Sequence, residues 1–281
     1  MKQFCVPLPF GKRLHVGLSD SDIDAALHSA GLVYGTSLVI DLYHRGKWQG
    51  RKDLGSGLVT NAGVLALANE GVNLAGVSGA PVNLFKLLKN HSSGTGATAA
   101  ATTDIKLQTA FTTNSAPVVA GTQVLISAAN LQKYQSVATL SYDTGTSNPT
   151  AITEWGIFTG GTLSANTGSP FTAGDATTGT STGTALTASS ATAQGHQQHI
   201  VENTGNATPH WGLIQSNSTS VFTVPAWYKV SDGTAAGTFP ANGNTYVIRP
   251  VMFDHKVFAA VNMSDGDSVA FTWTLTCSSG G

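Results

Sequence analysis

The feature that most constrains this chain is its scarcity of charge. Asp, Glu, Lys and Arg make up only 10% of the residues, against roughly 25% in an average soluble domain. Thr, Ser, Gly, Ala, Asn and Gln supply the polarity instead, and Thr is a good strand former. Such a composition is unusual for a cytosolic enzyme and is typical of β-rich proteins that work in many copies. Between Leu107 and Tyr228 the charged residues are Lys133, Asp143, Glu154, Asp175 and Glu202.

Length and net charge narrow the class of protein further. With 281 residues, of which 41% are hydrophobic, the chain can bury one or two cores. The formal net charge is −1, so we expect no broad basic face and no nucleic-acid partner. Weak self-repulsion favours a homo-oligomer. The first residues lack the apolar stretch of a signal peptide, and no run is long enough to span a membrane. We therefore expect cytoplasmic synthesis and no membrane partner.

Residues 1–79 are expected to form an N-terminal anchoring region with short helices. A capping box at Ser21–Asp24 predicts one short helix, and Thr60 predicts the N-cap of a second. Residues 32–44 predict one or two buried strands, whereas residues 46–57 predict a turn-rich connection.

The basic residues are unevenly distributed, since seven of the fourteen fall in the first 53 positions. One interpretation is an ordinarily charged N-terminal region. The other is a segment that docks on an acidic partner surface by charge complementarity. The candidate anchoring residues are Lys12, Arg13, Arg45, Lys47, Arg51 and Lys52.

From about residue 80 the sequence is typical of antiparallel β-structure. Residues 133–142 and 268–277 alternate apolar and polar side chains, which is the pattern of half-buried strands. Residues 220–230 and 245–253 also predict strands, which their prolines push toward a sheet edge or a bulge. Many short strands separated by Gly, Ser and Asn favour a β-sandwich or jelly roll.

The expected fold class is therefore mainly β, with an antiparallel sandwich or jelly-roll-like body, short N-terminal helices and a β-rich insertion. Residues 80–160 plus 252–281 are expected to form the body. Residues 161–251 are expected to form an inserted lobe or loop. The tract 160–190 is almost entirely Thr, Ser, Gly and Ala, which fits either a flexible loop or strands with a Thr-covered face.

No catalytic motif emerges from the sequence. It has no nucleophile elbow and no phosphate-binding loop, and its few acids support no glycosidase pair. We therefore expect neither enzymatic activity nor a cofactor. His196 and His199 have the spacing of metal ligands, but no Glu lies between them. A polar surface loop is preferred there over a metal site on the axis of a trimer. Asp265 and Asp267 predict a turn rather than a calcium site.

The aromatic residues divide into two groups. Trp155 and Trp273 fall in apolar strand patterns and predict core positions. Trp211, Trp227 and Tyr228 lie in less regular segments. Because aromatic faces stack on sugars, we take these three, with the histidine pair, as candidate surface contacts.

Four stretches occur in a recognisable order. Leu84–Thr109 has an apolar strand before a Gly-Thr-Gly turn, and Val118–Tyr142 has an Ala-Gly-Thr-Gln loop before a strand. Ala151–Thr159 reads Ile-Thr-Glu-Trp-Gly-Ile-Phe within a strand, and Asp254–Gly281 predicts a closing hairpin with a Gly-rich end. Together they resemble a widespread family of tailed-bacteriophage virion proteins. Residues 160–251 depart from the family's pattern, which is why they are interpreted as an insertion.

The resemblance implies a structural component of a virion, synthesised in the host bacterial cytoplasm. A capsid decoration, cement or head-fibre protein is the expected role, with capsid, neck or tail subunits as partners and a homotrimer as the expected assembly. The alternative is a tail fibre, spike or neck component that binds a receptor or a host-surface glycan.

Overall fold

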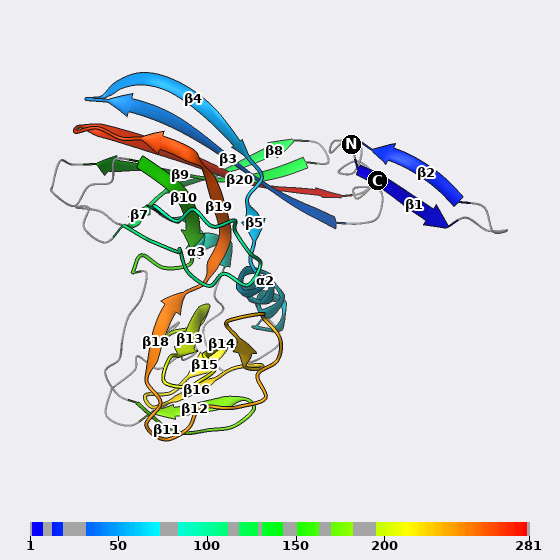
Figure 1. Cartoon of the computed structure of the whole chain (residues 1–281), viewed down its shortest axis with the longest axis vertical. Coiled ribbons are helices and arrows are strands. Elements are labelled where there is room, and N and C mark those ends of the chain that lie inside the picture. Colours follow the sequence, from blue (N-terminus) through cyan, green and yellow to red (C-terminus); the bar gives the residue numbers. More distant parts are fainter. Residues whose placement is uncertain are drawn as a thin grey trace.

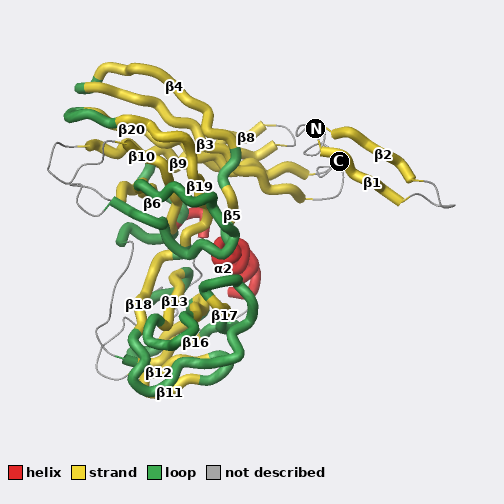
Figure 2. Tube along the Cα trace, viewed as in Figure 1, coloured by secondary structure: helices red, strands yellow, loops and turns green. Residues whose placement is uncertain are grey.

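The computed structural model describes residues 2–7, 13–18, 32–73, 84–111, 118–128, 131–142, 151–162, 170–181 and 195–279. These residues form several antiparallel sheets and two short helices, which confirms the mainly-β fold class. Figure 1 shows two β-lobes, one above the other, and Figure 2 shows the longer helix at the junction between them.

A long five-stranded sheet forms one layer of a β-sandwich in the upper lobe. Its central strand β20 (Asp267–Ser279) pairs with β3 (Leu32–His44) on one side and with β9 (Leu131–Tyr142) on the other. The outer strands are β4 (Lys47–Gly55) and β8 (Thr122–Ala128). The two edges of this sheet are therefore formed by segments far apart in the sequence.

A second five-stranded sheet forms the other layer. Its central strand β10 (Ala151–Phe158) pairs with β19 (Met252–Asn262) and with β6 (Asn90–Gly94). The short strands β5 (Leu58–Val59) and β7 (Val118–Ala120) lie at its edges.

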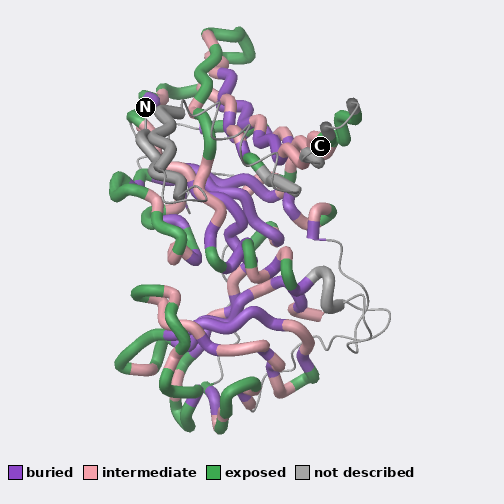
Figure 3. The backbone as a smooth tube through the Cα atoms, turned by 90° about the vertical axis from the view of Figure 1, so that its right-hand side faces the viewer, coloured by how far each residue is buried: buried purple, intermediate pink, exposed green. Residues whose placement is uncertain are grey.

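The core of the sandwich follows from the alternation in the sequence. β20 buries Val269, Phe271 and Trp273, as expected for one face of a half-buried strand. Trp155 of β10 stacks on Phe271 across the core, with ring centroids 6.2 Å apart. Both tryptophans predicted to be core residues are confirmed there. Figure 3 shows the buried residues concentrated in two interiors, one in each lobe.

The lower lobe consists of two four-stranded sheets. One contains β11 (Phe171–Gly174), β12 (Thr178–Ser181), β16 (Val221–Thr223) and β15 (Ser216–Asn217). The other contains β17 (Tyr228–Lys229), β14 (His210–Leu213), β13 (His199–Asn203) and β18 (Tyr246–Pro250). Aromatic side chains fill the space between the sheets, and the Phe171 and Tyr246 rings lie 4.6 Å apart.

Proline sets strand ends in this lobe. β16 ends before Pro225, and β18 ends at Pro250 on the edge of its sheet. β18 confirms the expectation that a proline moves a strand to an edge, because proline cannot donate a ladder hydrogen bond. For Pro225 that expectation is wrong, since β16 is an inner strand between β12 and β15 and the proline lies beyond its end. In the Thr-rich tract, β11 and β12 are extended strands, while residues 163–169 and 182–194 lie outside the described residues.

Helix α2 (Asn61–Asn73) joins the lobes. Its predicted N-cap is confirmed, since the Gly63 amide donates to Thr60 Oγ1 at 3.0 Å. Ala62 and Ala66 pack in the sandwich core, which here also includes Trp211 and Leu213 of the lower lobe. Gln198 Nε2 donates to the Ala66 carbonyl. The short helix α3 (Leu84–Leu87) lies beside β9, where Tyr134 donates to the Phe85 carbonyl.

The structure corrects the expectation that residues 1–79 form a separate N-terminal anchoring region. Residues 32–59 do not belong to a separate anchoring region, because β3 pairs along its whole length with β20 and β4 extends the same sheet. The predicted turn-rich connection at 46–57 is mostly the strand β4. Its residues are largely exposed, so it lacks the alternation that identifies a half-buried strand. The helix predicted after Ser21 lies outside the described residues.

Strands β1 (Lys2–Pro7) and β2 (Arg13–Leu18) form a separate antiparallel hairpin. Among the described strands they pair only with each other. Figure 1 shows this hairpin at the side of the sandwich, near both chain ends. An isolated two-stranded hairpin is marginally stable in water.

Candidate functional site

The basic residues of the N-terminal region gather on the hairpin formed by β3 and β4. Arg45 lies in its turn, and Lys47, Arg51 and Lys52 lie on β4; all four side chains are exposed. Of the other predicted anchoring residues, Arg13 begins β2 and Lys12 lies outside the described residues. We call the exposed residues Arg45, Lys47, Trp48, Arg51 and Lys52 of this hairpin the β4 surface. Trp48 and Arg51 share the face of Asp41, whereas Lys47 and Lys52 lie on the other face of the strand.

Trp48 is the most unusual residue of the β4 surface, because 61% of it is exposed. Its indole Nε1 donates to Asp41 Oδ1 at 3.2 Å. Arg51 forms a two-pronged pair with the same carboxylate, at 2.9 Å from Nε and 2.8 Å from Nη2. Arg51 holds the pKa of Asp41 below its ordinary value. The acid therefore stays ionised and fixes both side chains while the indole remains open to a partner.

Arg51 is thus neutralised, but its neighbours are not. In the part of the chain that the structure describes, Arg45, Lys47 and Lys52 have no acidic side chain within ion-pair distance. An exposed tryptophan beside an arginine has the residue types that are enriched in protein–protein contacts, and the unpaired cations add positive charge. This chemistry suits an acidic partner surface.

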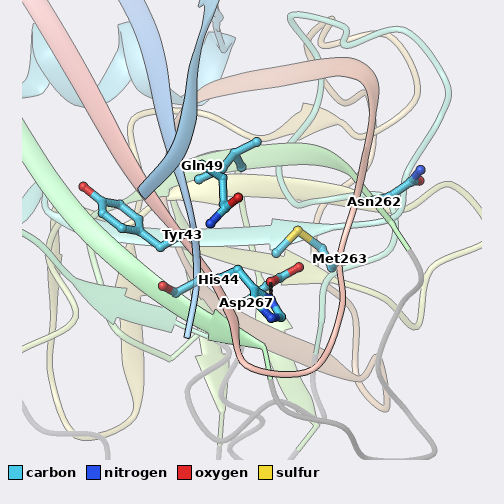
Figure 4. Close-up of a pocket in the computed structure, with 8 residues that line it drawn as sticks. Tyr43, His44, Gln49, Asn262, Met263 and Asp267 are labelled. Carbon is cyan, nitrogen blue, oxygen red and sulfur yellow. Dashed lines mark hydrogen bonds and ion pairs between the residues drawn. The ribbon is translucent and has the colours of Figure 1, made fainter. Parts of the chain in front are cut away.

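A pocket of mixed polarity lies beside the turn that carries Arg45. His44 Nδ1 lies 2.6 Å from Asp267 Oδ1, and the Arg45 amide donates to the Gly266 carbonyl at 2.9 Å. Figure 4 shows His44 and Asp267 together beside Met263. These residues line a cavity of about 260 Å³. The Asp267 carboxylate also accepts the Ser264 amide, so this segment is the predicted turn.

Two of the predicted surface contacts are wrong. Trp211 and Trp227 are each only 2% exposed. Trp227 packs in the lower-lobe core and donates to the Asp175 carbonyl, while Trp211 packs at the junction against α2. Their sequence neighbourhoods looked irregular because the strands around them are very short, which hides the alternation.

Tyr228 is half-buried and lines a cleft at the junction. Its ring lies 5.1 Å from that of Trp211, tilted by 33°. The cleft has a volume of about 300 Å³ and also includes Asn61, Val64 and Gly233 in its lining. Two of the predicted aromatic contacts, Trp211 and Tyr228, therefore line the same cleft.

The predicted histidine pair is brought together, but without further ligands. The rings of His196 and His199 lie 6.1 Å apart and nearly perpendicular. Burial lowers the pKa of both imidazoles, which favours their neutral forms. Among the described residues, no group of three His, Cys, Asp or Glu side chains is arranged to hold a metal ion.

A buried ionic network was not predicted from the sequence. Glu154 is fully buried and accepts the backbone amides of Gly96, Gln108 and Thr109. His255 bridges it to Asp104, with Nε2 at 3.2 Å from Glu154 and Nδ1 at 2.8 Å from Asp104. Because Asp104 lies 50 positions before Glu154 and His255 lies 101 positions after it, no local motif reveals the network.

The electrostatics of this network favour an ion triad. Burial alone would raise the pKa of Glu154, but its hydrogen bonds with His255 and the three amides hold that pKa below the ordinary value. Burial likewise opposes the charged form of His255, yet hydrogen bonds to Glu154 and Asp104 raise its pKa.

The network lies beside a cavity of about 390 Å³ that also contains Ser56 in its lining. A serine near a histidine and acids invites comparison with a catalytic triad. Both ring nitrogens of His255 already bind carboxylates, however, so none is left to accept a proton from Ser56. The arrangement instead fastens the segment 96–109 to the sandwich.

Comparisons with family models, with curated proteins and with solved structures find no match. Within the described residues, no helix has the length and apolar character needed to cross a membrane.

Proposed function

We propose that this chain is a structural subunit of a bacteriophage particle, most consistent with a capsid decoration, cement or head-fibre protein. The observation that carries the proposal is the β4 surface, where an exposed, oriented Trp48 lies beside Arg51 and Arg45, Lys47 and Lys52 are exposed along the same hairpin. The sheet behind it supplies a rigid support, and low charge elsewhere suits a subunit present in many copies. The role is mechanical rather than enzymatic, with an acidic surface of another virion subunit as the partner.

Rebinding to particles that lack the chain tests this proposal. Purified protein should cosediment with such particles, and its density should appear on the head in a particle reconstruction. Trp48→Ala should weaken binding roughly 30-fold, because a central aromatic anchor contributes most of the energy of an interface. Lys52→Glu and added salt should also weaken it.

Phe239→Ala is the matched control, since Phe239 is also an exposed aromatic residue, at 42%, but lies in the lower lobe. It should bind like the wild type. Failure of the wild-type chain to bind, or equal binding by Trp48→Ala, would contradict the proposal.

The cleft beside Tyr228 favours a second candidate, a tail-fibre, spike or neck component that binds a host-surface glycan. Tyr228 offers a half-exposed ring, and Asn61 offers an amide beside it. Glycan-array binding that Tyr228→Phe retains and Tyr228→Ala loses, with Trp48→Ala unaffected, would support this candidate over the first.

A further inference from the structure

The long sheet has a second exposed edge, strand β8, that differs sharply from β4. Its sequence Thr-Gln-Val-Leu-Ile-Ser-Ala contains no charged residue. Three consecutive apolar residues are exposed in its centre: Val124 at 46%, Leu125 at 69% and Ile126 at 40%. No other described strand pairs with the outer side of β8.

An edge strand of this kind is a template for another strand. Its outward backbone amides and carbonyls pair with no strand of the described part of the chain, and proteins usually protect such edges with charged residues or proline. β4, at the opposite edge, carries Lys47, Arg51 and Lys52 and is protected in this way. β8 has no such protection, and its exposed apolar residues favour pairing.

We propose that β8 pairs antiparallel with β8 of a second copy of this chain. The strand is self-complementary about Leu125. In the register centred on that residue, Leu125 faces the Leu125 of the second copy, and Val124 faces its Ile126. Gln123 then faces Ser127, so apolar residues meet apolar residues and polar residues meet polar ones.

The inner face of β8 offers further apolar surface. Leu125 lies opposite Tyr134 on β9, which lies opposite Leu275 on β20, so all three share one face of the sheet. These residues line a cavity of about 220 Å³ together with Phe85 and Cys277. Directly paired residues have Cβ atoms roughly 5 Å apart, so the second Leu125 reaches the rim of this cavity and covers it.

Electrostatics do not oppose the pairing. Two lysines lie near the strand: Lys133 of β9 is opposite Ile126, and the carbonyl of Lys86 in α3 accepts a hydrogen bond from Gln123. In the paired state two β8 strands separate the two Lys133 residues. Three inter-strand spacings of about 4.8 Å then lie between the lysine backbones. The resulting distance of roughly 14 Å exceeds the screening length at physiological salt.

The symmetry of this contact is two-fold, because the same strand is used by both copies. It joins the two long sheets into one continuous sheet and leaves each β4 surface at an outer edge. A trimer would need a head-to-tail interface, which β8 does not supply. The contact does not depend on a virion role, so the proposed function can fail while this inference stands.

The mass in solution is the first test. Wild-type protein should be a dimer by light scattering. Leu125→Lys should weaken association roughly 30-fold or more, because it places like charges opposite each other at the centre of the contact. Val64→Lys is the matched control, since Val64 is an exposed apolar residue on α2, and it should remain a dimer. Circular dichroism checks that both variants are folded.

Disulfide crosslinking tests the register. In a Cys5→Ser, Cys277→Ser background, Leu125→Cys should form crosslinked dimers on mild oxidation. Val124→Cys should link to Ile126→Cys when the two proteins are mixed, but each alone should link poorly. A wild-type monomer at roughly 100 µM, an unchanged mass for Leu125→Lys, or failure of Leu125→Cys to crosslink would each overturn the inference.

Discussion

At the scale of single residues, the least expected feature is a histidine held between two buried acids. His255 donates to both Glu154 and Asp104 only while both of its ring nitrogens carry a proton. Its pKa in the folded protein is raised above the ordinary 6.5. The stabilisation is therefore complete below about pH 6.5 and is lost as the pH rises through the folded-state pKa. Glu154 has a lowered pKa, so its contribution is lost in acid, as the pH falls below its ordinary 4.5 and through the folded-state value.

The raised pKa of His255 predicts how the stability of the protein depends on pH. His255→Gln should lower the free energy of unfolding most between about pH 5 and pH 6.5, and the difference from the wild type should shrink toward about pH 9. Urea unfolding at several pH values measures it. A difference that is constant over this range would show that His255 contributes packing rather than charge.

At the scale of secondary-structure elements, α2 shows packing overriding propensity. A Cβ added at Gly63 would lie 2.7 Å from the Phe253 carbonyl oxygen of β19. Gly63→Ala should therefore destabilise the protein by about 1–3 kcal/mol, although alanine in an open helix stabilises by about 1 kcal/mol over glycine. Val64→Ala, one residue further along, is the control and should change little. Thermal unfolding of both variants measures this, and a stabilised Gly63→Ala would contradict the close packing.

The elements also show what the sequence reveals. β9 and β20 alternate strictly, and the Thr60 cap precedes an apolar helix, so these were predicted correctly. β4 was missed because an edge strand exposed on both faces carries no alternation. Of the candidate site, the cations were predicted, but the fixed position of Trp48 beside Arg51 was not. The pairing of β4 with β3 brings Trp48 and Arg51 within hydrogen-bond distance of Asp41.

At the scale of the whole molecule, the two lobes share part of one core. Trp211 belongs to the lower lobe but packs with α2 in the sandwich core. Trp211→Ala should cost about 3–5 kcal/mol and lower hydrogen-exchange protection in both lobes. Trp227→Ala, inside the lower-lobe core, is the comparison and should loosen that lobe first. Loss of protection confined to the lower lobe in Trp211→Ala would show that the lobes unfold independently.

The lower lobe leaves and rejoins the sandwich at a single point. Phe158 at the end of β10 pairs with Met252 at the start of β19, and the Thr159 amide donates to the Val251 carbonyl at 3.0 Å. Because the two crossing strands are already neighbours, the number of residues between them does not affect how the sandwich strands are ordered. In evolutionary terms, this connection allows the lobe to be replaced without reordering the sandwich strands. Related chains could exchange it for a short turn or a different domain, adjusting the contacts of α2 and of Lys106, which pairs with Glu202 of the lobe, and keep both edges of the long sheet.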